Sequence, residues 1–294
     1  MRILHLFNWR LQDIIPYLDL ISSQGFDSIQ INPIQPLKNE DASDWWMSYQ
    51  PIRFDIGNRF GSREDLMRLC DEARKRNIRI IADVVCNHMA GKDNGELRPH
   101  EKVDSRLTSR ADFWKEDKRI SNWDDRYQVT HYSIGLPGLN VWNGELQDII
   151  IDFLNDLIDC GVDGFRFDAA KSIALPEEYC EFWPRVIYCL KKYGLELYGE
   201  VLNSDPSLIE KYAKYMRVLT DGYAYNPDSI VKFAESHDTY LGFGFTKNKS
   251  SSEIVNNYVD LTNIYNNTLF YARPFDDSWK SYNVECANKR LIKK

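Results

Sequence analysis

The stretch Gly161-Val-Asp-Gly-Phe-Arg-Phe-Asp-Ala-Ala-Lys171 decides the fold of this chain. It follows Glu145–Cys160, whose apolar residues recur at helical spacing, and Gly161 is the residue type expected just past a helix end. The short alternating run Gly164–Phe167 predicts a buried strand. At the carboxyl end of that strand lie three polar residues, Arg166, Asp168 and Lys171. Because functional groups of a parallel barrel project from this end, the stretch indicates either a chemically active, ionised aspartate or a structural Arg–Asp ion pair.

Strand-like and helix-like segments alternate along the whole chain. The expected strands are Arg2–Leu6, Ser28–Ile31, Ile78–Val85, Gly164–Phe167, Leu195–Tyr198, Arg217–Leu219, Ile230–Ala234 and Leu269–Tyr271. The expected helices are Leu11–Gln24, one that begins at Ser62 with a capping box to Asp65, Glu145–Cys160, Glu177–Tyr193, Ser207–Tyr215 and Ser252–Asn266. Strands that are apolar on both faces and alternate with helices form a parallel sheet. Eight of them predict an α/β fold, a closed (β/α)8 TIM barrel.

Three features depart from regular alternation. Residues 89–144 are long, polar and irregular, which predicts a small subdomain inserted after the third strand. We therefore expect the barrel over residues 1–88 and 145–294. The link 220–229 is too short for a barrel helix, so either a neighbouring loop or another subunit covers the apolar faces of the strands beside it, or the chain is a decayed or truncated version of the fold. After the last strand we expect only a short helix, Asp276–Leu291, and no carboxyl-terminal β-domain.

Composition excludes several classes of function. The chain has 294 residues, 43% hydrophobic, and a net charge of -7 with no basic cluster, which argues against a nucleic-acid partner. No apolar run approaches the length of a membrane span, and the first residues do not resemble a signal peptide. Six cysteines without metal-type spacing favour free thiols, with disulfides as the alternative. Together these features predict a cytoplasmic protein.

Four strand ends carry the polar residues that predict chemistry. They are Asp83-Val-Val-Cys-Asn87-His88, Arg166-Phe-Asp168, Tyr198-Gly-Glu200-Val and Glu235-Ser-His237-Asp238-Thr. Each segment alone is a weak signal. Together they bring three carboxylates and two histidines to one end of one barrel, where side chains converge on a single pocket.

These four segments, in this order, resemble the signature regions of the alpha-amylase family, glycoside hydrolase family thirteen. The segment Asp44-Trp-Trp-Met-Ser-Tyr49-Gln50-Pro51 is similar to the family's sugar-stacking segment, and Gly135-Leu-Pro-Gly-Leu-Asn140 is similar to its fifth region. The resemblance covers nearly the whole chain. Within the family, the sequence most resembles bacterial alpha-amylases of the Bacillus subtilis type.

The resemblance implies a retaining hydrolase that cleaves internal α-1,4-glucosidic bonds of starch, glycogen or maltodextrins. Asp168 would be the nucleophile, Glu200 the general acid and base, and Asp238 the residue that stabilises the distorted sugar. This division of labour needs environments that separate the pKa values of Asp168 and Glu200. The alternatives are a transglycosylase, an α-1,6-glucosidase, or a catalytically silent carbohydrate-binding relic of the fold.

The same resemblance assigns the substrate-binding residues. They are Tyr49, Gln50, Trp46, Trp45, His88, Arg166, Lys171 and His237. For Trp45 the alternative is core packing, and for Asp83 we expect a structural role. Ser172 stands where the family usually has a histidine.

A calcium ion is the cofactor that the resemblance raises, and the sequence departs from its usual ligands. Asn87 and the backbone oxygen after Lys171 persist, but Gly138 replaces the usual aspartate. Calcium prefers six to eight oxygen ligands with carboxylates among them. Unless Asp124 or Asp125 substitutes, we expect calcium dependence to be weak or absent.

Overall fold

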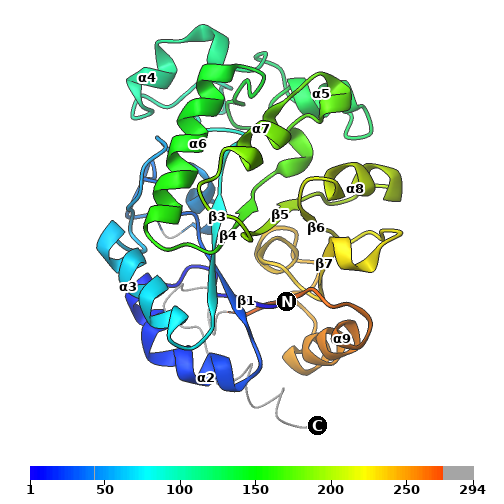
Figure 1. Ribbon diagram of the computed structural model, residues 1–294. Coiled ribbons are helices and arrows are strands. Elements are labelled where there is room, and N and C mark those ends of the chain that lie inside the picture. Colours follow the sequence, from blue (N-terminus) through cyan, green and yellow to red (C-terminus); the bar gives the residue numbers. More distant parts are fainter. Residues whose placement is uncertain (43, 274–294) are drawn as a thin grey trace.

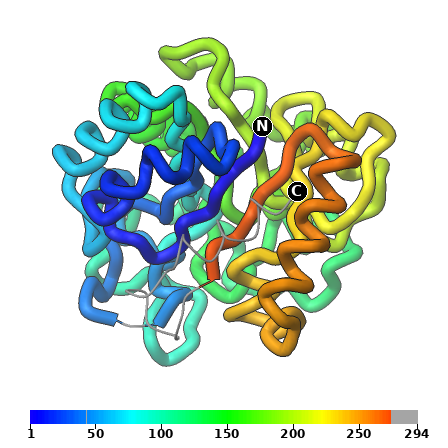
Figure 2. Tube along the Cα trace, turned by 90° about the horizontal axis from the view of Figure 1, so that it is seen from below, coloured from blue at the N-terminus to red at the C-terminus, as the bar shows by residue number. Residues whose placement is uncertain are grey.

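The computed structural model describes residues 1–42 and 44–273, which form a closed barrel of eight parallel strands in sequence order. The strands are β1 (Arg2–His5), β2 (Ser28–Ile31), β3 (Arg79–Val84), β4 (Gly164–Phe167), β5 (Glu196–Glu200), β6 (Arg217–Leu219), β7 (Ile230–Phe233) and β8 (Thr268–Tyr271). Figure 1 shows the helices arranged around them. Strand β1 pairs with β8, and Figure 2 shows these first and last strands running side by side. The predicted (β/α)8 barrel is confirmed; the expected helix Asp276–Leu291 lies outside the described residues.

The strand register places polar residues in one layer of the barrel. Asp83 on β3 is opposite Arg166 on β4, and Arg166 is opposite Tyr198 on β5. All three are buried. Since a barrel interior is filled by layers of side chains, this row of charged and hydroxyl groups departs from the usual apolar filling. It leads directly to Asp168 and Glu200 at the strand ends.

The first helices follow local sequence signals. The expected helix Leu11–Gln24 is broken into α1 (Leu11–Ile14), the 3₁₀ turn η1 (Ile15–Tyr17) and α2 (Leu18–Ser23). Pro16 explains the break, because proline removes a backbone donor and clashes with the preceding turn. Helix α3 (Arg63–Arg74) begins with the predicted capping box: the hydroxyl of Ser62 accepts from the backbone of Asp65, and the Asp65 carboxylate accepts from the backbone of Ser62.

The later helices are shorter than expected at one place. Helix α6 (Gly144–Asp159) precedes β4 as predicted, but Glu177–Tyr193 yields only η5 (Pro176–Glu178) and α7 (Phe182–Tyr188). Tyr179 lies between them with φ 61°, a left-handed conformation that ends a right-handed helix. Helices α8 (Pro206–Ala213) and α9 (Ser251–Ile264) agree closely with expectation. Within the part of the chain that the structure describes, no helix has the length and apolar character needed to cross a membrane.

The long connection between β3 and α6 is irregular. It contains α4 (Ser105–Thr108), the turn η3 (Ala111–Phe113) and α5 (Arg126–His131), and in Figure 1 α4 and α5 lie at opposite sides of the top of the view, above the strands. Single β-bridges pair His88 with Gly138 and Trp114 with Leu139, so the connection is fastened to the chain that leaves β3. Its exact limits as a subdomain stay a prediction.

The short link between β6 and β7 contains only the 3₁₀ turn η6 (Pro227–Ser229), as its length indicated. The neighbouring strand faces have the cover that the short link made necessary. Val218 on β6 and Val231 on β7 are fully buried. Contacts of α8 with β6 and of α9 with β7 supply cover for these strands within the same chain.

Candidate active site

One buried arginine organises the carboxyl ends of three neighbouring strands. Arg166 is only 1% exposed. Its Nη1 donates to Asp168 Oδ1 at 2.7 Å and to Asp83 Oδ1 at 2.9 Å, and its Nη2 donates to Glu200 Oε1. A single guanidinium therefore faces three carboxylates from β3, β5 and the end of β4. Because one positive charge cannot balance three negative ones, protonation of one of these carboxyls is favoured.

The carboxyl of Glu200 is fixed a second time by the backbone after Asp168. Ala169 has φ 46° and ψ 36°, a left-handed conformation that is rare for residues with a side chain. Its backbone N–H donates to Glu200 Oε2 at 3.1 Å. Strained conformations of this kind persist where the surrounding structure holds them, often at functional sites. Asp168 and Glu200 are thus linked both through Arg166 and through Ala169.

Burial raises the pKa of the clustered carboxyls. It raises the pKa of Glu200 to about 7; Arg166 opposes the shift, while Asp238 and Asp168 add to it. The pKa of Asp168 is also raised by burial, against the pull of Arg166. Burial likewise raises the pKa of Asp238, although a hydrogen bond with Glu200 lowers it. A carboxyl with a pKa near 7 is suited to act as a general acid at neutral pH. The predicted separation between Asp168 and Glu200 stays a prediction.

Aromatic rings form one wall of the site. Tyr49, at the end of η2 (Trp45–Tyr49), donates its hydroxyl to Asp83 Oδ2 at 2.9 Å, and its ring stacks on His237 with centroids 5.3 Å apart. The Trp45 ring meets the His237 ring edge-on, with centroids 5.7 Å apart. It also packs against the core, so Trp45 contributes to both the wall and the interior. Trp46 is 47% exposed and Tyr49 only 8%. Trp46 therefore offers the larger open surface to a ligand.

Two polar side chains of the same wall have unused hydrogen-bonding atoms. His88 donates through Nε2 to the carbonyl of Tyr49 at 3.0 Å. Within the described residues, its Nδ1 and the Oε1 of Gln50 are buried and have no hydrogen-bond partner. Unpaired buried polar atoms are rare, and a bound ligand is one way to satisfy them. Burial lowers the pKa of His88 to about 4 and that of His237 to about 3, so both rings are neutral at pH 7.

The remaining predicted residues lie in the segments that follow β7 and β4. His237 Nε2 is 3.4 Å from Asp238 Oδ2. Asp238 begins the π-helical turn η7 (Asp238–Gly242) after β7. Lys171, in η4 (Ala170–Ser172), donates to the carbonyls of Leu202 at 3.2 Å and Asn203 at 2.9 Å. Its ammonium therefore holds the loop after β5, and its contact with a substrate stays a prediction.

Sequence reasoning missed three polar residues beneath the carboxylates. Tyr198 donates its hydroxyl to Gln30 Oε1 at 2.8 Å, and Gln30 Nε2 lies 3.3 Å from His5 Nε2 and 3.4 Å from Asp83 Oδ2. A cavity is lined by His5, Gln30, Arg166, Glu200 and His237 among others. The signal that could have found His5 and Gln30 is a polar residue inside a strand that is otherwise apolar.

The candidate calcium ligands are engaged with a lysine. Asn87 Oδ1 and the backbone oxygen of Ser172 each accept a hydrogen bond from Lys115 Nζ, both at 2.8 Å. Asp125, one of the alternative ligands, instead caps the first turn of α5. Across residues 1–42 and 44–273, no group of three or more histidine, cysteine or acidic residues could hold a metal ion. The residues present do not fit calcium.

Comparison with known proteins agrees with this geometry. The model of the alpha-amylase catalytic domain matches residues 10–218. An alpha-amylase of Clostridium acetobutylicum is 36% identical over 232 residues, which cover 75% of this chain and 30% of that protein. An alpha-amylase of Thermomonospora curvata is 35% identical over 183 residues, covering 58% of this chain and 30% of that protein. The chain thus spans about a third of the length of these curated relatives.

Solved structures show the same fold. The crystal structure of an alpha-amylase from Geobacillus thermoleovorans, complexed with acarbose, has a TM-score of 0.76 at 20% sequence identity, and the match covers 99% of this chain and 77% of that one. The alpha-amylase I of Eisenia fetida has a TM-score of 0.76 at 18% identity, over 95% of this chain and 69% of that one. At such identities the likeness concerns the fold alone. The match to the catalytic-domain model over most of the chain goes further, and on that ground the protein belongs to the alpha-amylase family of glycoside hydrolases.

Proposed function

We propose that this chain cleaves internal α-1,4-glucosidic bonds of starch, glycogen or maltodextrins with retention, through a covalent glycosyl-enzyme. The observation that carries the proposal is the placement of Asp168 and Glu200 on the two arms of the Arg166 guanidinium. Two carboxyl groups that flank one bond are the usual requirement of glycoside hydrolysis, and in retaining enzymes they lie about 5–5.5 Å apart. Asp238, beside Glu200, supplies a third carboxyl at the same place.

In the proposed reaction, Glu200 is protonated and donates its proton to the glycosidic oxygen as that bond breaks. Asp168 attacks the anomeric carbon and forms the glycosyl-enzyme. The Glu200 carboxylate then takes a proton from water, whose oxygen displaces Asp168. The raised pKa of Glu200 supports the first step, because a carboxyl with a pKa of about 7 keeps its proton in a large fraction of the molecules at neutral pH. Arg166 keeps both groups oriented throughout.

The nature of the substrate is supported by the relatives and by the wall of the site. Both bacterial relatives described above are named alpha-amylases, and the Geobacillus structure holds acarbose. Trp46 offers an exposed ring at the mouth of the site, and the free polar atoms of His88 and Gln50 can bond sugar hydroxyls. The finer resemblance to Bacillus subtilis-type amylases stays a prediction.

Within the described residues the five cysteines are free, which supports a cytoplasmic location.

The experiment is release of reducing ends from soluble starch by the purified chain and by the Glu200→Gln variant. Loss of the acid should lower the rate about 10²–10⁴-fold. Glu177→Gln is the matched control, because Glu177 lies on the surface paired with Lys214, away from the site. A folded chain that binds starch but releases no reducing ends would instead indicate a silent binding protein. Cleavage of pullulan in preference to maltoheptaose would indicate an α-1,6-glucosidase.

A further inference from the structure

A half-buried lysine joins three segments that are far apart in the sequence. Lys115 lies in the long connection between β3 and α6, Asn87 follows β3, and Ser172 ends η4 after β4. The Nζ of Lys115 donates to Asn87 Oδ1 and to the Ser172 carbonyl, each at 2.8 Å, and its backbone N–H donates to the carbonyl of Gly138 at 2.8 Å. The side chain therefore bridges the connection to the ends of two barrel strands.

Gly138 provides the space that this lysine needs. A Cβ atom at position 138 would lie 2.7 Å from Lys115 Cδ and 3.2 Å from both Lys115 Cγ and Ser133 Oγ. The backbone of Gly138 is outside the left-handed region, so its conformation does not itself require glycine. The Lys115 stem cannot move away easily, because its terminal nitrogen is held at two points. The replacement of the family's aspartate by glycine and the presence of the lysine thus belong together.

A calcium ion cannot share this position with Lys115. Calcium takes six to eight oxygen ligands at 2.3–2.6 Å, and carboxylates supply the opposing charge. Here the two available oxygens are neutral and both already accept from Lys115. An ammonium and a dication at one point would also repel each other strongly in a buried setting.

We propose that Lys115 permanently occupies the position at which the family resemblance places a structural calcium ion, and that it joins the connection to the barrel without any metal. The donor count supports this substitution. Burial lowers the pKa of Lys115 to about 7, yet the nitrogen has enough protons to donate to both oxygens in either its charged or its neutral form.

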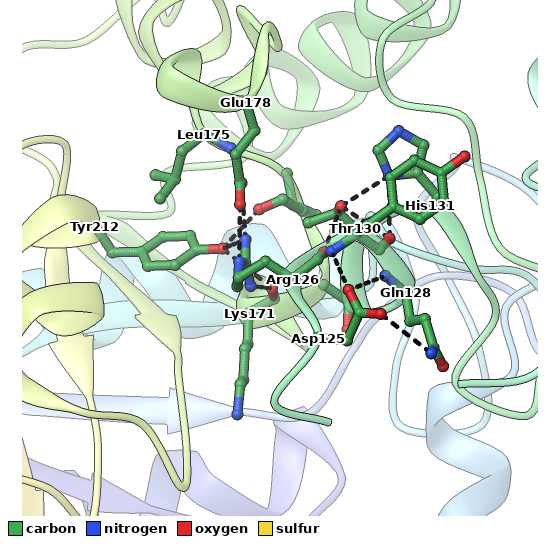
Figure 3. A network of polar contacts seen from close by, with 12 residues as sticks. Asp125, Arg126, Gln128, Thr130, His131, Lys171, Leu175, Glu178 and Tyr212 are labelled. Atoms are coloured by element: carbon green, nitrogen blue, oxygen red, sulfur yellow. Dashed lines mark hydrogen bonds and ion pairs between the residues drawn. The ribbon is translucent and has the colours of Figure 1, made fainter. Parts of the chain in front are cut away.

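A second cation from the same connection, Arg126, also binds η4. Arg126 Nη1 donates to the carbonyl of Lys171 at 2.7 Å, and the same guanidinium pairs with Glu178 and contacts the Tyr212 hydroxyl (Figure 3). The consecutive carbonyls of Lys171 and Ser172 are therefore each bound by a different cation of the connection. This holds η4, which directly follows Asp168 and Ala169, in a fixed place.

The test measures thermal melting and calcium binding in the absence of substrate, so its outcome is independent of the proposed hydrolysis. For the unmodified chain, we expect a melting temperature that excess EDTA or millimolar CaCl₂ shifts by about 1 °C or less, because the site offers a metal too few ligands. Equilibrium dialysis should find no stoichiometric calcium. A melting temperature that falls in EDTA and recovers with calcium would overturn the proposal.

The Lys115→Met variant tests the lysine itself. It keeps the length of the stem but leaves two buried oxygens without their donor, so the melting temperature should fall by roughly 3–10 °C and calcium should not restore it. Lys118→Met is the matched control, since Lys118 lies on the surface of the same segment and pairs with Glu116. An unchanged melting temperature for Lys115→Met would show that Lys115 does not stabilise the attachment of the connection to the barrel.

The Gly138→Ala substitution tests the coupling between the two positions. In the unmodified chain the added methyl group meets the Lys115 stem and should lower the melting temperature. In a Lys115→Ala background that stem is absent, so the same substitution should have a smaller effect. Equal effects in the two backgrounds would contradict the assignment of Gly138 as the space for Lys115.

Discussion

Two cations lie at the same end of this barrel, the buried Arg166 and the half-buried Lys115, and their surroundings are opposite. Arg166 contacts three carboxylates, whereas Lys115 contacts two neutral oxygens. Around Arg166 negative charge is in excess, and the pKa values of the carboxyls rise. Around Lys115 the two acceptors are neutral oxygens, and among the described residues no carboxylate forms an ion pair with it. The first arrangement is suited to moving protons, and the second is suited to holding segments of chain together.

The largest difference between the two centres should appear when each cation is removed. Arg166→Met leaves Asp83, Asp168 and Glu200 buried without their shared partner, which should lower the free energy of unfolding by about 3–5 kcal/mol. Lys115→Met leaves only neutral acceptors, whose loss of a donor costs less than an unpaired charge, so the total loss should be about 1–3 kcal/mol. Urea unfolding of the two variants measures both values.

The same pair of variants differs in its response to pH. The loss in Arg166→Met should become smaller toward acidic pH, because protonation neutralises the carboxyls that lack a partner. If Arg166→Met proves less destabilised than Lys115→Met, the view of Arg166 as the centre of a charge cluster is wrong. The conservative Arg166→Lys variant, which keeps the positive charge, should lose less than Arg166→Met.

A smaller effect should separate proton chemistry from structure within the unmodified chain. Burial raises the pKa of Glu200 to about 7, so its protonated form is abundant below pH 7 and is lost as pH rises through that value. We expect kcat on maltodextrin to fall about tenfold per pH unit above pH 7, because the general acid must carry its proton. The control is the melting temperature over the same range. A kcat that stays constant up to pH 9 would contradict the role of Glu200 as the acid.

The sequence predicted the Arg166 centre far better than the Lys115 centre. Asp168 and Glu200 follow strands that are recognisable by their apolar residues, and the ends of parallel strands meet by geometry alone. Lys115 lies in an irregular connection, 57 positions from Ser172, and no periodic pattern places it. The departure at Gly138 could be noted from the sequence, but its physical reason is a contact between side chains that only the structure shows.

In the fold, too, local features could be predicted from the sequence and long-range features could not. Ser62 and Asp65 form the capping box that their spacing indicated, because capping depends only on residues of one turn. The break at Tyr179 escaped prediction, since a tyrosine in the left-handed region carries no local signal. The cover over β6 and β7 also escaped it, because α8 and α9 reach these strands through tertiary packing.

The smallest expected effect concerns Arg126, the second cation that binds a carbonyl of η4. Arg126 Nε and Nη2 contact the two Glu178 oxygens, each at 2.8 Å, while Nη1 holds the Lys171 carbonyl. A lysine has a single nitrogen and cannot reproduce this fork. Arg126→Lys should therefore lower the free energy of unfolding by about 1 kcal/mol, as measured by urea unfolding. Arg119→Lys is the control, because Arg119 is exposed and, among the described residues, donates to the carbonyl of Gly95 at the surface. In the double variant Arg126→Lys/Lys115→Met, the loss in free energy of unfolding should differ from the sum of the two single losses by at least about 0.5 kcal/mol. The reason is that the two cations bind successive carbonyls of η4, Arg126 that of Lys171 and Lys115 that of Ser172. Strict additivity would mean that the two cations act as independent contacts and not as one joint.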